Sequence, residues 1–385
     1  SDVDSNDAPT SVVDDQSDAT NQTSDSGFIP EIPLNAQPEV SPEDENTVVL
    51  QAPTTVQLGS LRLQVFSDTT TSVTLGSLDE IEKWQMEVQF TRAGAGISSI
   101  RFSEIFETVN GKLNWNRYRT DGGDAPPIDE LYLLTTSTEL EYLTPSGTAT
   151  ATASVLGASQ IIVNGQTLHL TSPVFWNVAS QVEHESVTYE AFVIDEAGNK
   201  VARIVRSWSL SDQFGLHLEQ YVQNLSEQEI DVQWLQYGPP SLTVDRSRYM
   251  DRRRFRFGWE LSDEFDPNHA APIQSNDFLY EYADAAKQKT PLWPTEETLE
   301  EGYKLSWFAS TNRYFALGVF PNVDDTGKGN RVITNKIVSI SSQKYGAEKA
   351  EYILTALLSP NKLIASGELF DLTMGVYAGP LKRSI

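Results

Sequence analysis

The longest regular alternation of apolar and polar residues in the chain covers residues 186–225. Apolar side chains recur at every second position until the segment Asp195–Asn199 interrupts them, and the alternation then resumes. A period of two residues is typical of a half-buried β-strand. Gly198 and Asn199 tolerate a positive φ better than other residues, so the interruption can form a tight turn. The stretch therefore predicts a β-hairpin.

A third strand is predicted after a second turn at 211–215. Its alternating positions separate into an apolar face and a polar face, with Leu216, Leu218, Gln220 and Val222 on the first and His217, Glu219 and Tyr221 on the second. Three consecutive antiparallel strands with one apolar face need a second layer to cover that face.

The rest of the chain repeats this kind of pattern in short segments. Some 16 to 20 short strands are predicted against one or two helices, the best helix at 275–289. Asn164-Gly165 is a strong hairpin signal, and Pro239 and Pro240 should end the strand predicted from Asp231, because proline cannot donate to a β-ladder. We expect an all-β fold in which residues 48–385 form one large antiparallel β-sandwich domain.

Composition and charge restrict the classes of function. The chain has 385 residues, no cysteine and a net charge of −26. Residues 1–47 are acidic and polar, which predicts a disordered linker. Disulfides and cysteine nucleophiles are excluded, and an acidic surface makes nucleic acid an unfavourable partner. The histidines have no metal-ligand spacing, and no cofactor, metal site or serine-nucleophile motif is expected. No segment is apolar over the length that a membrane-spanning helix needs.

An arginine-rich segment interrupts this acidic composition at residues 246–256, where six of eleven residues are arginine. On a strand, Arg252, Arg254 and Arg256 would lie on one face, and the other face would carry Arg253, Phe255 and Phe257. The basic face could contact an acidic partner or lipid headgroups, or its arginines could pair with nearby acids of the chain. Both interpretations stay open at this point.

Several segments, taken in order, resemble the large periplasmic domain of the YidC membrane-protein insertase family. They are the strand, turn and strand at Val88–Ile100, the hairpin turn Asp195–Asn199 with the following Tyr221–Asn224, and the late segments Trp307–Ala316 and Val376–Leu381. The resemblance covers roughly residues 86–381, and the last segment is its most specific part.

The resemblance implies a super-β-sandwich similar to the sugar-mutarotase sandwich. It implies a chain that is not an enzyme and has no catalytic residue, and that supports insertion and folding of inner-membrane proteins together with the Sec translocase. Its partners would be accessory Sec subunits and nascent membrane proteins. The chain would face the periplasm between an anchoring helix and a membrane core, with Tyr377, Gly379 and Pro380 at the junction to that core.

A mutarotase-type sandwich is also compatible with a carbohydrate-binding or sugar-epimerising protein. Epimerisation needs a general base and an acid, usually Glu and His. The four histidines are His169, His184, His217 and His269, and a pocket that joins one of them to a glutamate would favour an enzyme. A shallow groove for a glycan or a peptide would favour binding. Six tryptophans could line such a groove or fill a core, namely Trp176, Trp208, Trp234, Trp259, Trp293 and Trp307.

Overall fold

The computed structural model describes most of the chain after residue 58. The described residues are 59–67, 72–144, 147–211, 213–243, 253–261, 273–275, 291–300, 303–323, 329–330, 336–345 and 350–381. The predicted linker at 1–47 and nearly all of the predicted helix at 275–289 lie outside them, as do Arg252 and His269.

The largest of the described sheets has 12 strands, in the order β1-β11-β12-β13-β25-β19-β18-β15-β16, with β10, β20 and β24 paired alongside. Its strands are β1 (Arg62–Leu63), β10 (Asn177–Val182), β11 (Ser186–Ile194), β12 (Lys200–Leu210), β13 (Gly215–Asn224), β15 (Arg254–Leu261), β16 (Ile273–Ser275), β18 (Tyr303–Thr311), β19 (Phe315–Val323), β20 (Gly329–Asn330), β24 (Leu369–Asp371) and β25 (Met374–Pro380).

The other described strands form three smaller sheets. A seven-stranded sheet contains β8 (Ala158–Val163), β9 (Gln166–His169), β14 (Ile230–Tyr237), β17 (Pro291–Trp293), β21 (Lys336–Tyr345), β22 (Ala350–Leu358) and β23 (Lys362–Ile364). A four-stranded sheet contains β2 (Val73–Gly76), β3 (Met86–Thr91), β4 (Gly96–Phe106) and β5 (Leu131–Thr136), and β6 (Thr138–Thr144) pairs with β7 (Gly147–Ala153). The pairings between these strands are antiparallel.

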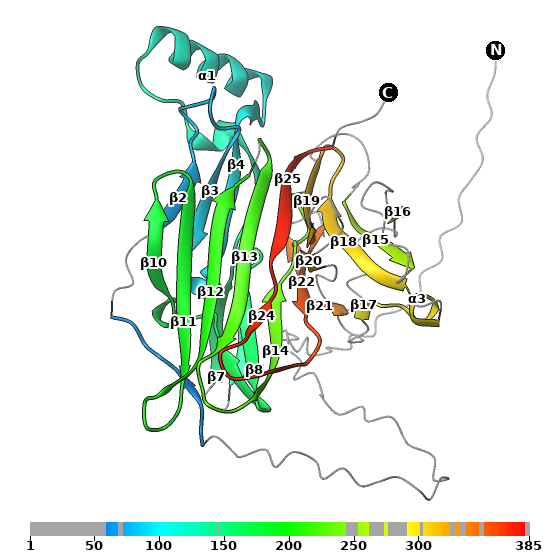
Figure 1. Cartoon of the computed structure of the whole chain (residues 1–385). Coiled ribbons are helices and arrows are strands. Elements are labelled where there is room, and N and C mark those ends of the chain that lie inside the picture. The colour runs from blue at the N-terminus through cyan, green and yellow to red at the C-terminus, as the bar shows by residue number, and fades with distance from the viewer. Residues whose placement is uncertain are drawn as a thin grey trace, which may run out of the picture.

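Two α-helices lie within the described residues, α1 (Val109–Asp121) and α3 (Glu296–Glu300). The Thr108 hydroxyl caps α1 by accepting a hydrogen bond from the Gly111 N–H, and α1 ends at Gly122, where φ is positive. Figure 1 shows α1 standing off one end of the sandwich. Neither helix is long and apolar enough to cross a membrane.

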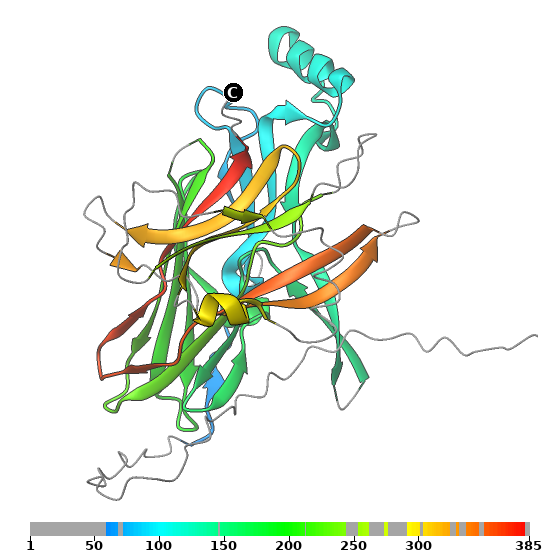
Figure 2. The same cartoon turned by 90° about the vertical axis from the view of Figure 1, so that its right-hand side faces the viewer.

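The main core lies between the large sheet and the two sheets behind it, as the two views show (Figures 1 and 2). It contains fully buried side chains from each of them, among them Phe90 on β3, Ile161 on β8 and Trp208 on β12. These layers confirm the predicted all-β, antiparallel sandwich. Burial of this apolar surface is the main favourable contribution to stability.

The predicted meander at 186–225 is present as β11, β12 and β13. Gly198 has a φ of 89° in the β11–β12 turn, and Asn164 and Gly165 have φ values of 49° and 78° in the β8–β9 turn, so both hairpin predictions are confirmed. β14 ends at Tyr237, just before Gly238 and the two prolines, as expected.

Candidate functional site: the outer face of the large sheet

The large sheet has an inner face toward the core and an outer face away from it. On β13 the inner face carries Leu216 and Leu218, both buried in the core, and the outer face carries His217 and Glu219. We call the side of the sheet with His217 the outer face. Cross-strand partners point to the same side of a sheet, so the strand register shows which residues of the other strands lie on the outer face.

One row of partners crosses the middle of the outer face. Ser209 on β12 lies opposite His217, His217 lies opposite Gly375 on β25, and Gly375 lies opposite Phe320 on β19. Gly375 has no side chain, and the ring of Phe320 occupies the space that a Cβ there would fill. The ring therefore covers the glycine and extends toward His217. Its side chain remains 43% exposed.

A second aromatic ring lies on the outer face beside this row. Phe308 is opposite Val319 in the β18–β19 register, which places Trp307 and Phe320 at neighbouring positions on the outer face. Trp307 is half-buried, and its indole covers Gly258 on β15 as Phe320 covers Gly375. Each of these two aromatic side chains thus lies over a glycine of the strand next to its own. The sequence gives no local signal for this arrangement.

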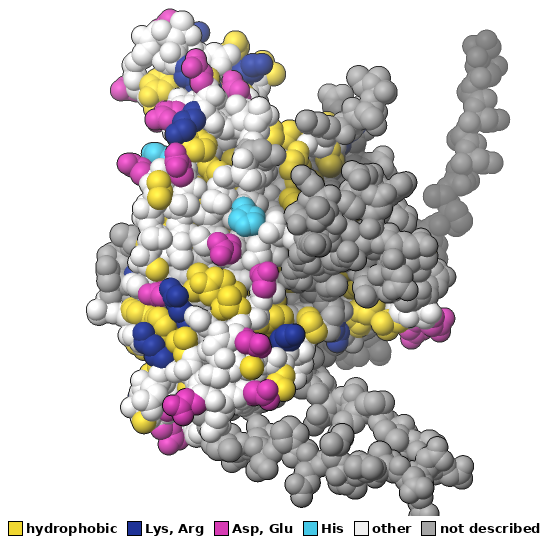
Figure 3. All heavy atoms as spheres, viewed as in Figure 1, with side chains coloured by type: hydrophobic (Ala, Val, Ile, Leu, Met, Phe, Trp, Pro, Cys, Tyr) yellow, Lys and Arg dark blue, Asp and Glu magenta, His cyan; other side chains and the backbone are white. Residues whose placement is uncertain are grey.

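Polar groups border the aromatic residues. In the row next to His217, Glu219 lies opposite Ser207, which lies opposite Thr188, and the two hydroxyl groups are 2.9 Å apart. Further along, Arg203 donates two hydrogen bonds to Glu190, at 3.1 and 3.2 Å. Figure 3 shows this face, with a histidine and several carboxylates over the middle strands. Neither His217 nor Glu219 has a side-chain hydrogen bond within the described part of the chain.

Two of the three predicted contact arginines lie on the same outer face. Arg254 and Arg256 on β15 are half-buried, whereas Phe255 and Phe257 point into the core, so the predicted separation of faces is confirmed for these four residues. The Arg253 side chain is buried and donates to the Leu242 carbonyl at 3.4 Å. Contact of these arginines with a partner stays a prediction.

The three predicted junction residues lie in β25, between β13 and β19. Tyr377 is on the outer face, and its hydroxyl donates to the Pro380 carbonyl at 2.6 Å. Its hydroxyl also lies close to Gly379, beside Phe214. The structure places these residues inside the large sheet, and their predicted role as a junction stays untested.

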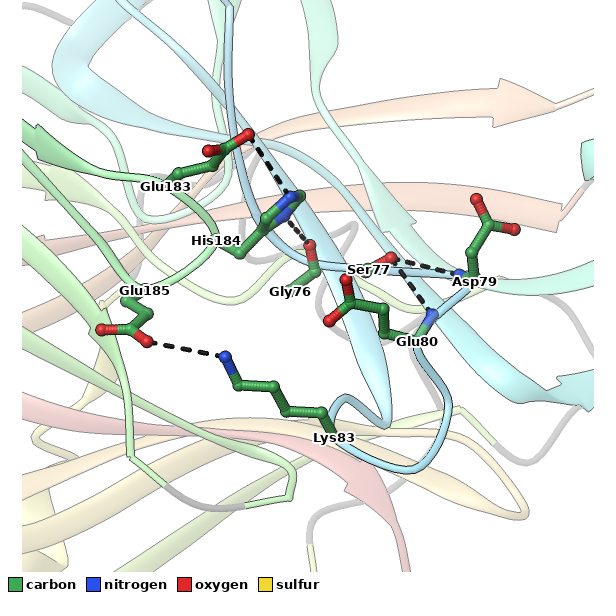
Figure 4. Close-up of polar contacts among 8 residues, drawn as sticks. All are labelled: Gly76, Ser77, Asp79, Glu80, Lys83, Glu183, His184 and Glu185. Carbon is green, nitrogen blue, oxygen red and sulfur yellow. Dashed lines mark hydrogen bonds and ion pairs between the residues drawn. The ribbon is translucent and has the colours of Figure 1, made fainter.

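The other described histidines lie outside this face. His169 ends β9, where burial lowers its pKa, and its Nδ1 is 3.4 Å from the Gln160 amide nitrogen. His184 lies in the β10–β11 turn, with Nδ1 2.7 Å from the Gly76 carbonyl oxygen and Nε2 3.8 Å from a Glu183 carboxylate oxygen (Figure 4). Since a backbone carbonyl only accepts, Nδ1 donates, and the contact joins β10 and β11 to the end of β2.

The surroundings of His184 are rich in charge. Lys83 pairs with Glu185 at 3.6 Å, and the Ser77 hydroxyl accepts from the N–H groups of Asp79 and Glu80 (Figure 4). The 79–83 turn and the end of α1 enclose an open hollow of about 900 Å³. Among the described residues, no group of three or more His, Asp or Glu side chains is arranged to hold a metal ion. The contacts of His184 and Glu185 connect the β10–β11 turn to the end of β2 and to the 79–83 turn.

Five of the six tryptophans are buried, and Trp307 alone among them is half-buried on the outer face. Trp208 and Trp234 lie around Arg206, whose guanidinium carbon is 5.5 and 6.0 Å from their rings. Arg206 is fully buried on the inner face and donates to the carbonyls of Gly94 and Leu156, at 2.9 and 2.5 Å. Burial lowers its pKa to about 9, so it stays charged at neutral pH. Its role is structural.

The sequence matches no protein-family model and no curated protein. Solved structures do match. One is a galactose mutarotase related enzyme from Lactobacillus acidophilus, with 13% identity and a TM-score of 0.40 over 80% of this chain and 97% of that chain. Another is a GalM/aldose epimerase homologue from C. elegans, with 13% identity and a TM-score of 0.39 over 81% and 99%. A putative aldose 1-epimerase from Escherichia coli K12 has 10% identity and a TM-score of 0.38 over 81% and 99%.

These matches contradict the predicted membership of the YidC family, because the matching proteins are named as mutarotases and epimerases. The names of these proteins also contradict the predicted insertase-supporting role in the inner membrane and the prediction that the chain is not an enzyme. The segments that carried the resemblance are turns and strands, such as the turn at Gly94 with a φ of 68°, that other antiparallel sandwiches also need. The periplasmic location and the protein partners stay predictions.

Proposed function

We propose that the chain binds saccharides on the outer face of its large sheet. The observation that supports this most directly is the exposed ring of Phe320, which covers Gly375 in the same cross-strand row as His217. In this row the ring of Phe320 forms an apolar platform beside hydrogen-bonding groups. A sugar ring requires both features of a protein surface.

The apolar part of the argument comes from the two glycines. A sugar ring has a face of C–H groups that packs against an aromatic ring. Aromatic side chains in a protein core are covered on both sides, whereas Phe320 lies over Gly375 and is still 43% exposed, and Trp307 lies over Gly258 and is half-buried. Gly375 and Gly258 allow the rings to lie close to the strands, so that a flat ligand could lie on their other side.

The polar part comes from the neighbouring side chains. An imidazole both donates and accepts hydrogen bonds, and a carboxylate accepts up to four, so His217 and Glu219 complement sugar hydroxyl groups. Ser207, Ser209 and Thr188 add hydroxyl groups along the same face. Because the imidazole and the carboxylate have no side-chain hydrogen bond within the described residues, binding would not need to break one.

The shape of the face favours a chain of sugars over an enclosed single sugar. A pocket surrounds most of a small ligand, whereas side-by-side strands contact a ligand from one side. Strands lie about 4.8 Å apart, so the distance from β13 to β18 is about 14 Å, which corresponds to several sugar units.

The experiment is a calorimetric titration of the full chain with neutral oligosaccharides of two to six units. We expect Phe320→Ala to weaken binding about tenfold, because loss of an aromatic contact of about 1.4 kcal/mol changes Kd by that factor. Tyr314→Ala is the matched control: its side chain is 47% exposed, it lies in the β18–β19 turn away from the row, and it should bind as the native chain does.

Equal binding by the native chain and Phe320→Ala would overturn the proposed site. Failure of every oligosaccharide to bind at millimolar concentration would overturn the proposed function. Binding of extended peptides in place of sugars, with the same dependence on Phe320, would assign the face to a different ligand.

A second candidate function is epimerisation at the anomeric carbon, and it is favoured by the placement of His217 and Glu219 two residues apart on one face of β13. Proton transfer to and from a sugar needs an acid and a base in positions of this kind. Measurement of the interconversion of α- and β-anomers by NMR tests it directly. His217→Gln and Glu219→Gln should each abolish a catalysed rate, and an interconversion rate no faster than in buffer would exclude this candidate.

A further inference from the structure

The arginines of β15 lie on the same surface as the proposed saccharide site. Arg256 is opposite Ala309 on β18, Ala309 is opposite Gly318 on β19, and Gly318 is opposite Tyr377 on β25. Two small residues therefore separate Arg256 from Tyr377. Trp307 lies opposite Gly258, two residues along β15 from Arg256. Arg256 is thus two residues along β15 from the glycine that Trp307 covers, with no large side chain in the row between Arg256 and Tyr377.

Arg256 is held in place by one hydrogen bond. Its Nε donates to the Thr311 hydroxyl oxygen at 3.3 Å, and the hydroxyl in turn donates to the Arg254 carbonyl, also at 3.3 Å. The Nε bond fixes one edge of the guanidinium. Within the described part of the chain, its two terminal nitrogens have no hydrogen bond and pair with no carboxylate. Among these residues they are therefore available to a ligand.

The electrostatic setting of Arg256 is unfavourable without an anion. Partial burial lowers its pKa, and so does the positive charge of Arg254. Both effects mean that the folded chain holds this cation at a cost, in a protein whose net charge is −26 and which offers many carboxylates elsewhere. A bound anion would offset the loss of hydration at Arg256.

We propose that Arg256 forms an anion-binding subsite that makes the preferred ligand of the outer face an acidic oligosaccharide. This inference rests on the proposed saccharide function and names its substrate class. A guanidinium binds a carboxylate or a sulfate through two parallel N–H···O bonds, and the free edge of Arg256 has the geometry for this. Arg256 is two strands, about 10 Å, from Phe320, so one sugar unit can lie on the platform while the acidic group of another reaches Arg256.

The test compares two forms of one ligand. A galacturonate tetrasaccharide and its fully methyl-esterified form have the same length and linkage and differ in charge. The native chain should bind the acid form about tenfold more tightly at low salt, with a steep loss of affinity as salt rises. Arg256→Gln should remove that difference and leave the affinity for the ester unchanged. Arg117→Gln, an exposed arginine on α1, removes the same charge and should change neither affinity.

The outcomes separate this inference from the proposed function. If both forms bind with equal affinity and lose it in Phe320→Ala, the saccharide function stands and the anion subsite is wrong. If neither form binds, the proposed function is wrong. A titration with inorganic sulfate alone tests whether Arg256 binds a free anion. If sulfate binds as tightly as the acid tetrasaccharide, the oligosaccharide assignment is overturned. Arg256→Lys keeps the charge without the paired donors and should restore only part of the preference.

Discussion

The two faces of the large sheet hold charged and aromatic side chains in opposite ways. On the inner face, Arg206 lies opposite Tyr189 on one side and Gln220 on the other, and all three are buried. On the outer face, His217 and Phe320 lie in a row that water reaches. The inner arginine donates to two backbone carbonyls, whereas the side chain of the outer histidine has no hydrogen bond with the residues that the structure describes.

This difference separates residues that maintain the fold from residues that are available to a ligand. The inner row leaves the Tyr189 hydroxyl, the Arg206 Nε and the Gln220 amide oxygen without hydrogen-bond partners among the described residues. Burial also raises the pKa of the Tyr189 hydroxyl. Polar groups in this position cost stability unless their partners are kept, so substitutions there should act on folding. Substitutions on the outer row should act on binding.

The largest effect is expected for Arg206→Ala. It removes a large side chain from the core and leaves the Gly94 and Leu156 carbonyls without their donor, at a cost of about 3 kcal/mol in the free energy of unfolding. Arg203→Ala, three residues earlier on the outer face, breaks a partly exposed pair with Glu190 and should cost about 0.5 kcal/mol. Urea denaturation measures both. Equal losses would mean that the two faces do not differ as described.

A smaller effect on stability and a clear effect on binding are expected for Gly375→Ala. The new methyl group would occupy the space that the Phe320 ring now fills, so the ring must move away from the strand. We expect a loss of about 1 kcal/mol in stability and a loss of oligosaccharide affinity close to that of Phe320→Ala. NMR of the Phe320 ring protons detects the movement. Unchanged chemical shifts of these ring protons together with native affinity would contradict the proposed role of Phe320 as a platform for the sugar.

The smallest effect on stability is expected for a substitution of Glu87 on β3. Its carboxylate is half-buried, so its exposure lies between that of the inner row and that of the outer row. Burial raises its pKa above 4.5, and Asp79 adds to the effect, against a hydrogen bond from Gln89. The charged form therefore lowers stability at neutral pH. This penalty is absent below pH 4.5, where the carboxyl is protonated in both states, and complete above the raised pKa.

Glu87→Gln should consequently be slightly more stable than the native chain at pH 7, and the difference should disappear as the pH falls toward 4.5. Thermal melting at a series of pH values measures it. A difference that grows toward acid pH would reverse the sign and show that the charged form of Glu87 stabilises the fold.

Local sequence patterns predicted the strands well and predicted α1 not at all. The alternation at 186–225 was sufficient because one face of each strand is buried. In α1 only Gly111 and Trp115 are buried, so the helix has no apolar stripe to reveal it. The available signals were its ends, Thr108 as a cap and Gly122 after the last turn.

The candidate site was predictable in part. Alternation along β13 was enough to place His217 and Glu219 together on the solvent side. Their neighbours Gly375 and Phe320 come from strands far along the chain, and local pattern does not encode which distant strands pair or in which register. The same limit explains the incorrect family assignment, since short turn motifs report backbone geometry and carry little information on function.

The position of β25 has a consequence for biosynthesis. Residues 374–380 pair with β13 on one side and β19 on the other, and thereby join the two halves of the large sheet. Until a ribosome has released this segment, the edges of β13 and β19 have no partner there, and both remain open to pairing with other chains. Completion of the sheet must therefore follow the synthesis of residues 374–380, and the edges of β13 and β19 stay open to other strands until then.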